Sequence, residues 1–166
     1  EYQIVTNRTF EDASKWYHCV WQIDASQGTA ANRSRVWIDG DEITSWSSAA
    51  YPAQNTDVVG LADGTVIRIS SLSHSVLQFF DGYIAEFNCV SGSIVDVSTF
   101  GETDTSTGRW VPKALTGITY GTNGFRLQFG TSSALGDDTS GNGNDFSSTN
   151  LDSTNQTIDS PTQTFT

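Results

Sequence analysis

The chain has 166 residues and a mass of 18.0 kDa, the size of one ordinary domain, which excludes two unrelated catalytic domains. Its 19 acidic and 8 basic side chains give a net charge of −11, which repels phosphate backbones and anionic lipid surfaces, so nucleic acid is not an expected partner. Membrane insertion is not expected either, because no run of about 18 apolar residues is present.

Strand-forming residues dominate the composition. Only 16% of residues are charged, and β-branched, aromatic and turn-forming residues fill the gap, which favours short strands and loops over helices. Hydrophobic alternation with a period of two is clear in segments 16–24 and 82–90. In chain order, we expect strands at 2–6, 16–24, 33–38, 42–46, 65–70, 76–80, 82–90, 94–97 and 125–129.

Turn dipeptides separate these segments. Asp39-Gly40 lies between two strand candidates and Asn123-Gly124 precedes another, and both pairs accept the positive φ of tight hairpin turns. Antiparallel pairing follows, and the one helical candidate is a single turn at 10–15. The fold class expected is all-β, an antiparallel jelly-roll β-sandwich spanning residues 1–130.

Residues 131–166 differ from the rest of the chain. No Lys or Arg occurs after Arg126, and Ser, Thr, Asn, Asp and Gly predominate. Such a segment is either a disordered tail or an extended arm that packs its few apolar side chains on the sandwich or on a neighbour. We favour the arm, because Phe146, Leu151 and Ile158 are spaced like anchors.

The two cysteines, Cys19 and Cys89, lie in predicted strands and lack the close spacing of zinc or thioredoxin-type motifs. Two buried thiols are the simpler interpretation, and one bridge between neighbouring strands is the alternative.

No arrangement typical of a hydrolase is present. Glycoside hydrolases on related folds place carboxylates on alternate residues of one strand, whereas Asp39, Asp41 and Glu42 cluster at a hairpin turn, where solvated carboxylates are ordinary. His18 and His74 are far apart in sequence and accompany no nucleophile elbow. No enzymatic activity and no required cofactor are therefore expected.

One segment has the opening spacing of a calcium loop. Asp138, Ser140 and Asn142 place oxygen-bearing side chains at alternate positions before Gly143, and Asp145 follows. The twelfth position is Thr149 instead of a bidentate Glu. A weak calcium site and a Gly/Asn-rich turn held by side chain to backbone hydrogen bonds are the two interpretations, and we favour the turn.

Aromatic residues in polar loops suggest glycan contact. Trp46 and Tyr51 bracket a loop that continues through Asn55 and Asp57, and Trp110 closes another polar run. A sugar is recognised by stacking on a ring while amides and carboxylates bind its hydroxyls. Burial of the tryptophans in the core is the alternative interpretation.

The order of motifs resembles a known family. Residues 10–18, 32–33, 36–40 and 81–86 resemble the second half of laminin-G-like, concanavalin-type jelly rolls. The following blocks are similar to tail-fibre and other structural proteins of bacteriophages: 100–101, 108–113, 120–125, 135–138, 140–146 and 159–162. Domains of this type usually carry several strands ahead of the one containing Trp16 and His18. The resemblance thus implies a fragment of a longer virion polypeptide, or strands supplied by a neighbouring chain.

The resemblance implies a non-enzymatic virion structural or adhesion module at the virion surface or outside the cell. Its expected partners are surface glycans or other virion proteins, with homo-oligomerisation or membership of a longer chain. A secreted lectin-like carbohydrate-binding domain is the alternative, and a polysaccharide-degrading enzyme comes third.

Overall fold

The computed structural model describes residues 3–57, 67–69 and 79–157. In these ranges the chain is β-rich, as its composition predicts, with short strands, short 3-10 helices and no α-helix. The strands are β1 (Gln3–Thr6), β2 (Cys19–Ile23), β3 (Ser34–Ile38), β4 (Asp41–Glu42), β5 (Trp46–Ala50), β6 (Phe87–Cys89), β7 (Gly101–Thr103), β8 (Trp110–Pro112) and β9 (Phe125–Leu127). The 3-10 helices are η1 (Ala30–Arg33), η2 (Val97–Thr99) and η3 (Ser153–Asn155).

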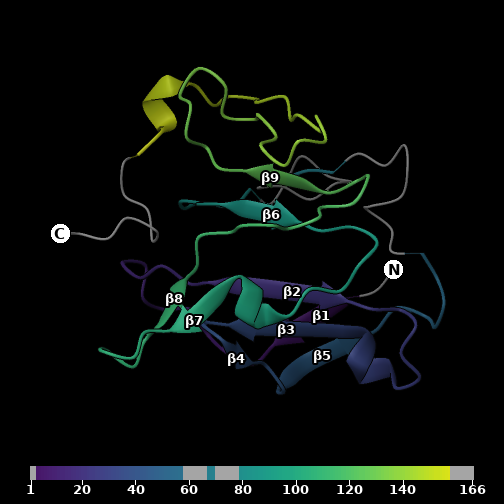
Figure 1. Cartoon of the computed structure of the whole chain (residues 1–166). Coiled ribbons are helices and arrows are strands. Elements are labelled where there is room, and N and C mark those ends of the chain that lie inside the picture. The colour runs from purple at the N-terminus through teal and green to yellow at the C-terminus, as the bar shows by residue number, and fades with distance from the viewer. Residues whose placement is uncertain (1–2, 58–66, 70–78, 158–166) are drawn as a thin grey trace. The chain divides into compact units, whose positions relative to one another are not determined.

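The described strands pair antiparallel in small sheets (Figure 1). One sheet has the order β2-β3-β4, and the others are the pairs β1-β5, β6-β9 and β7-β8. The chain divides into two compact units. The described part of the first covers residues 3–57 and 94–118, and that of the second covers 67–69, 79–93 and 119–157.

The hairpin between β3 and β4 forms at the predicted dipeptide. Asp39 and Gly40 both adopt positive φ, 54° and 84°, which is the backbone of a type I′ turn. Ile38 therefore pairs with Asp41, and on the other side of β3 it pairs with Cys19 of β2. This register buries Trp37 and Ile38 in the first unit.

The core of the second unit forms around β9. Phe125 and Leu127 are each 2% exposed, and Tyr120 is buried beside them in the chain. Phe125 stacks on Phe87 of the paired strand β6, with ring centroids 5.8 Å apart, and Phe146 packs against Phe125 at 4.7 Å. The predicted anchor Phe146 thus packs on the strand β9 of its own unit.

Asn123-Gly124 does not form the expected positive-φ hairpin turn. Neither residue has positive φ, and β9 pairs with β6, far back in the chain. Gly124 is required for another reason: a Cβ there would overlap the carbonyl oxygens of Tyr120 and Cys89. Close backbone approach, rather than turn conformation, selects glycine at this position.

Several predicted strands are shorter or differently placed. Segment 42–46 contains the end of β4 and the first residue of β5, and segment 82–90 forms a strand only at β6. Segment 94–97 leads into η2, where the Asp96 carboxylate accepts a hydrogen bond from the Ser98 backbone N–H. Segments 65–70 and 76–80 lie partly outside the described residues, and His74 and Ile158 lie outside them altogether.

Both cysteines are free thiols. Cys19 is exposed, so the expectation of two buried thiols is wrong for this residue, and Cys89 is half-buried. Desolvation by burial raises the pKa of Cys89 to about 11, which keeps its thiol protonated at neutral pH.

Candidate functional site

The polar loop after β5 brings together three of the predicted glycan-binding residues. Three hydrogen bonds tie its backbone or its Gln54 side chain to the segment between β2 and β3: Asn55 N–H to Ala25 O at 2.8 Å, Arg33 Nη1 to Pro52 O at 3.1 Å and Gln54 Nε2 to Ser26 O at 3.2 Å. Pro52, the second residue of the loop, is buried. The loop backbone is therefore held in place before any ligand arrives.

The side chains of this loop remain available. Tyr51 is half-buried and Asn55 and Asp57 are exposed, and within the described ranges no hydrogen bond reaches any of these three side chains. Asn55 adopts φ of 57°, a conformation that Asn tolerates better than most residues. An aromatic ring, an amide and a carboxylate are thus presented on one fixed loop, which we call the Tyr51 loop (residues 51–57).

Trp46 opens β5 opposite Thr6 of β1 and is half-buried. It therefore belongs to the paired strand that leads into the Tyr51 loop, and no described contact places its ring beside Tyr51. Its role in glycan contact stays a prediction.

Trp110 is engaged by protein groups. Its Nε1–H donates a hydrogen bond to Nδ1 of His18 at 3.0 Å. A Cβ atom added to Gly40 or Gly101 would overlap the Trp110 indole. The two glycines leave the space that the half-buried indole fills. Because these contacts occupy the ring, we leave Trp110 out of the candidate glycan site.

The Asp39 carboxylate holds the hairpin turn next to this tryptophan. It accepts hydrogen bonds from the His18 backbone N–H at 2.9 Å and from Lys15 Nζ at 2.8 Å, and Arg8 lies 3.8 Å away. Partial burial opposes ionisation, but these hydrogen bonds and positive charges outweigh it and lower the pKa of Asp39. For His18, desolvation lowers the pKa against the attraction of Asp39, which favours the neutral ring that accepts from Trp110.

The candidate calcium residues form a hydrogen-bonded turn. The Asp138 carboxylate accepts backbone N–H groups of Arg126, Ser140 and Asn144 at 2.8–2.9 Å, and it also accepts the Ser140 hydroxyl. Asp145 accepts the Asp138 backbone N–H, and the Asn142 amide donates to the carbonyls of Gly121 and Gly124. Burial opposes ionisation of Asp138, and the four donors outweigh it, so its pKa is lowered.

These hydrogen bonds correspond to the second interpretation of the segment, a turn held by side chain to backbone contacts. The lone pairs of Asp138 that a cation would need are directed at protein donors instead. In the described part of the chain, no three His, Cys, Asp or Glu side chains are grouped as a metal site. Calcium binding by Asp138, Ser140, Asn142 and Asp145 stays a prediction without a preformed ligand set.

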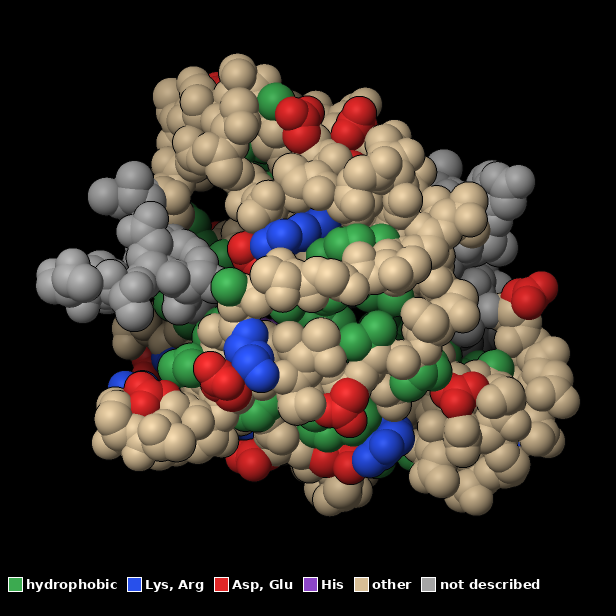
Figure 2. Space-filling view, in the orientation of Figure 1, with side chains coloured by type: hydrophobic (Ala, Val, Ile, Leu, Met, Phe, Trp, Pro, Cys, Tyr) green, Lys and Arg blue, Asp and Glu red, His purple; other side chains and the backbone are tan. Residues whose placement is uncertain are grey.

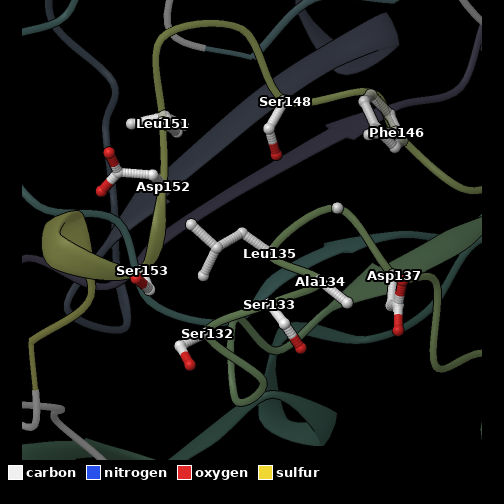
Figure 3. A pocket seen from close by; sticks show the side chains of 11 residues that line it. Ser132, Ser133, Ala134, Leu135, Asp137, Phe146, Ser148, Leu151, Asp152 and Ser153 are labelled. Carbon is white, nitrogen blue, oxygen red and sulfur yellow. The ribbon is translucent and has the colours of Figure 1, made fainter.

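A hollow that the sequence did not reveal lies in the second unit. It has a volume of about 560 Å³ and is bordered by two segments, 132–137 and 146–153 (Figure 3). Leu135 projects into the space between the segments, and the Ser148 hydroxyl points toward it. The sequence feature that relates to this hollow is the spacing of apolar residues in segment 131–166, which predicts packing anchors and not a cavity.

No known protein family, curated protein or solved structure matches this chain. Among the described residues, no helix is long and apolar enough to cross a membrane.

Proposed function

We propose that this chain is a non-enzymatic adhesion module that contacts surface glycans through the Tyr51 loop. The observation that carries this proposal is a loop fixed by two hydrogen bonds to its backbone and one from its Gln54 side chain, while the side chains of Tyr51, Asn55 and Asp57 are left without partners among the described residues. A preformed loop loses little conformational entropy on binding, and its ring, amide and carboxylate match the apolar face and hydroxyls of a sugar.

The states of the carboxylates support a non-enzymatic role. A glycosidase needs one carboxyl group with a raised pKa to act as the acid. Every carboxyl pKa that is shifted in the described ranges is lowered, including those of Asp39 and Glu42 at the hairpin. Glu42 is ionised in a two-point contact with Arg35, at 2.7 and 2.6 Å.

The proposed setting is the surface of a virion or the extracellular space. It is supported by the similarity of the motifs to bacteriophage structural proteins, which would also make the small sheets part of a laminin-G-like jelly roll. The low charge content and hydroxyl-rich surface suit this setting, and Figure 2 shows a face covered mostly by backbone and uncharged polar side chains.

The test is binding of the full chain to a glycan array, followed by two variants. Asn55→Gly removes the amide while keeping a residue suited to positive φ, and Asp57→Ala removes the carboxylate. Each is expected to weaken binding at least about tenfold, which corresponds to about 1.4 kcal/mol. Asp41→Ala is the matched control, because it removes an exposed carboxylate from the same unit without touching the loop.

Binding that is unchanged in both loop variants would overturn the proposal. So would the absence of glycan binding by the wild-type chain, or release of reducing ends from a polysaccharide. The alternative of a free secreted lectin predicts the same loop but a monomer, so light scattering on the purified chain separates the two settings.

A second candidate function, assembly with further copies of the chain, is favoured by exposed aromatic residues. Phe79, Phe80 and Tyr83 are 70%, 55% and 69% exposed within five residues of sequence. Aromatic groups of this kind are enriched at protein interfaces. A constitutive oligomer that dissociates on Phe79→Ser would support this function, and a concentration-independent monomer would contradict it.

A further inference from the structure

The hollow in the second unit is bordered by segments whose backbones are fixed. Phe146 N–H donates to Gly136 O at 2.8 Å, and a Cβ at Gly136 would overlap the carbonyl oxygen of Phe146, so the two segments touch through their backbones. The ring of Phe146 is anchored on buried Phe125. Just after the second segment, Gln156 Nε2 donates to Phe129 O at 2.6 Å. The two segments are therefore joined at Gly136 and Phe146, and the second is tied back to the chain where it ends.

The lining combines apolar surface with unused hydrogen-bonding groups. Of the apolar lining residues, Leu135 and Phe146 are half-buried and Leu151 is 54% exposed. In the described part of the chain, no hydrogen bond is made by the side-chain oxygens of Ser132, Ser133, Ser148, Ser153 or Asp137. Such a lining suits a ligand that has both an apolar face and several hydroxyl groups.

The charge of the lining narrows the class of ligand. Asp137 and Asp152 border the hollow on opposite sides in Figure 3, and no Lys or Arg occurs in the sequence after Arg126. Arg126 itself pairs with Glu86 at 3.2 Å. The Asp152 carboxylate points away from Leu135 in Figure 3 and accepts the backbone N–H and the hydroxyl of Thr154, so it does not face a ligand in the hollow. An anionic ligand would still meet the Asp137 carboxylate with no opposite charge in the lining, which disfavours it.

We propose that this hollow is a second ligand site and that it takes a neutral saccharide. One face of the sugar lies on Leu135 and Leu151, and its hydroxyls exchange hydrogen bonds with the serines and with Asp137. The volume of about 560 Å³ lies within the range of roughly 300–1,000 Å³ that is usual for small-molecule sites. The site extends the proposed glycan contact from the Tyr51 loop to a separate place in the chain, and either site can fail alone.

The test is an NMR titration of the full ¹⁵N-labelled chain with the methyl glycosides of glucose, galactose and mannose and with N-acetylglucosamine. At least one sugar is expected to shift the amides of residues 132–137 and 146–153 saturably. The methyl glucuronide is a charged counterpart of the methyl glucoside and is expected to bind at least about tenfold more weakly. Equal binding of the two would overturn the proposal, as would the absence of saturable shifts in these segments with every sugar.

Two neighbouring serines provide a matched pair of variants. Ser148→Tyr places a ring in the hollow, whereas Ser147→Tyr makes the same change at an exposed residue outside its lining. The first is expected to abolish the shifts and the second to leave them unchanged. Leu151→Ala removes an exposed apolar contact without emptying a core, so it should weaken binding even if Ser148→Tyr alters the fold.

The same spectra separate this proposal from the proposed function. Saturable shifts at residues 51–57 alone would leave the Tyr51 loop as the glycan site and reject the hollow. Shifts at 132–137 and 146–153 alone would do the reverse.

Discussion

At Asp138 a single carboxylate gathers backbone groups from three places in the chain. It accepts the N–H of Arg126 in β9, of Ser140 two residues later, and of Asn144. Hydrogen bonds to an ionised acceptor are about twice as strong as neutral ones, and an unsatisfied backbone donor is costly. One side chain thus fixes the turn against the strand.

Replacing Asp138 with Ala is expected to lower the free energy of unfolding by about 2 kcal/mol or more, because three backbone donors lose their acceptor. Urea denaturation followed by circular dichroism measures the loss. Asp137→Ala is the matched control: it removes the adjacent exposed carboxylate, to which no described group donates, and should change stability by less than about 0.5 kcal/mol. Equal effects of the two variants would refute the role of Asp138.

The contacts of Asp138 belong to a wider pattern that the sequence contains. In six Asp-x-Ser/Thr segments, beginning at Asp12, Asp24, Asp96, Asp104, Asp138 and Asp152, the carboxylate accepts both the backbone N–H and the hydroxyl of the residue two positions later. The motif is not sufficient, since Asp145-Phe146-Ser147 also matches it and the Asp145 carboxylate instead binds the N–H of Asp138. Local chemistry thus predicts these turns, and longer-range contacts decide the exceptions.

Among the elements, β7 and β8 illustrate what alternation of hydrophobic residues fails to predict. Gly101–Thr103 has no alternating apolar pattern, yet it pairs with Trp110–Pro112, because the Trp110 indole covers Gly101 and reaches His18. By contrast, β2 lies within segment 16–24, where alternation predicts a strand, and β1 and β3 lie within the expected strand segments 2–6 and 33–38. The hairpin at Asp39-Gly40 is predictable because its backbone conformation requires those residue types.

The candidate sites, like the strands, differ in how far the sequence predicts them. Aromatic and polar residue types predict the Tyr51 loop as a candidate glycan site, but the sequence does not reveal that Trp110 is held by His18 and two glycines. The hollow could not be found from the sequence, because it depends on the contact between Gly136 and Phe146.

Gly101→Ala is expected to destabilise the pairing of β7 with β8. The new methyl group would overlap the Trp110 indole, and overpacking of this kind costs about 1–3 kcal/mol. Thermal unfolding and the tryptophan emission spectrum measure the loss and the movement of the ring. Gly28→Ala in the same unit is the control, since its Cβ meets nothing within 4 Å and its φ is not positive. A melting temperature equally unaffected by both substitutions would contradict this packing.

At the scale of the whole molecule, these aspartates link stability to pH. The pKa values of Asp12, Asp24, Asp96, Asp104 and Asp152 are lowered chiefly by the Ser or Thr hydrogen bonds, and that of Asp138 is lowered by its donors against burial. A carboxyl group with a lower pKa in the folded state stabilises the fold above its unfolded-state pKa. That contribution is lost as the pH falls through the folded-state value.

The melting temperature is therefore expected to fall as the pH drops below about 4, the unfolded-state pKa of Asp. Differential scanning calorimetry across the acid range measures this fall. Asp138→Asn keeps an acceptor that does not titrate, so the variant should be less stable at neutral pH but lose less stability on acidification. Parallel pH profiles for wild type and variant would show that Asp138 does not contribute to the linkage.

The six turns also bear on the order of events in folding. In each turn, the hydrogen bond from the Asp carboxylate to the residue two positions later spans only two peptide units. Its formation therefore costs little chain entropy and requires no distant strand to be in place. Closure of such short segments occurs on the scale of tens of nanoseconds, well before a hairpin forms in microseconds. Loop geometry at six points can therefore be established early, which leaves fewer arrangements for the sheets to search when they pair.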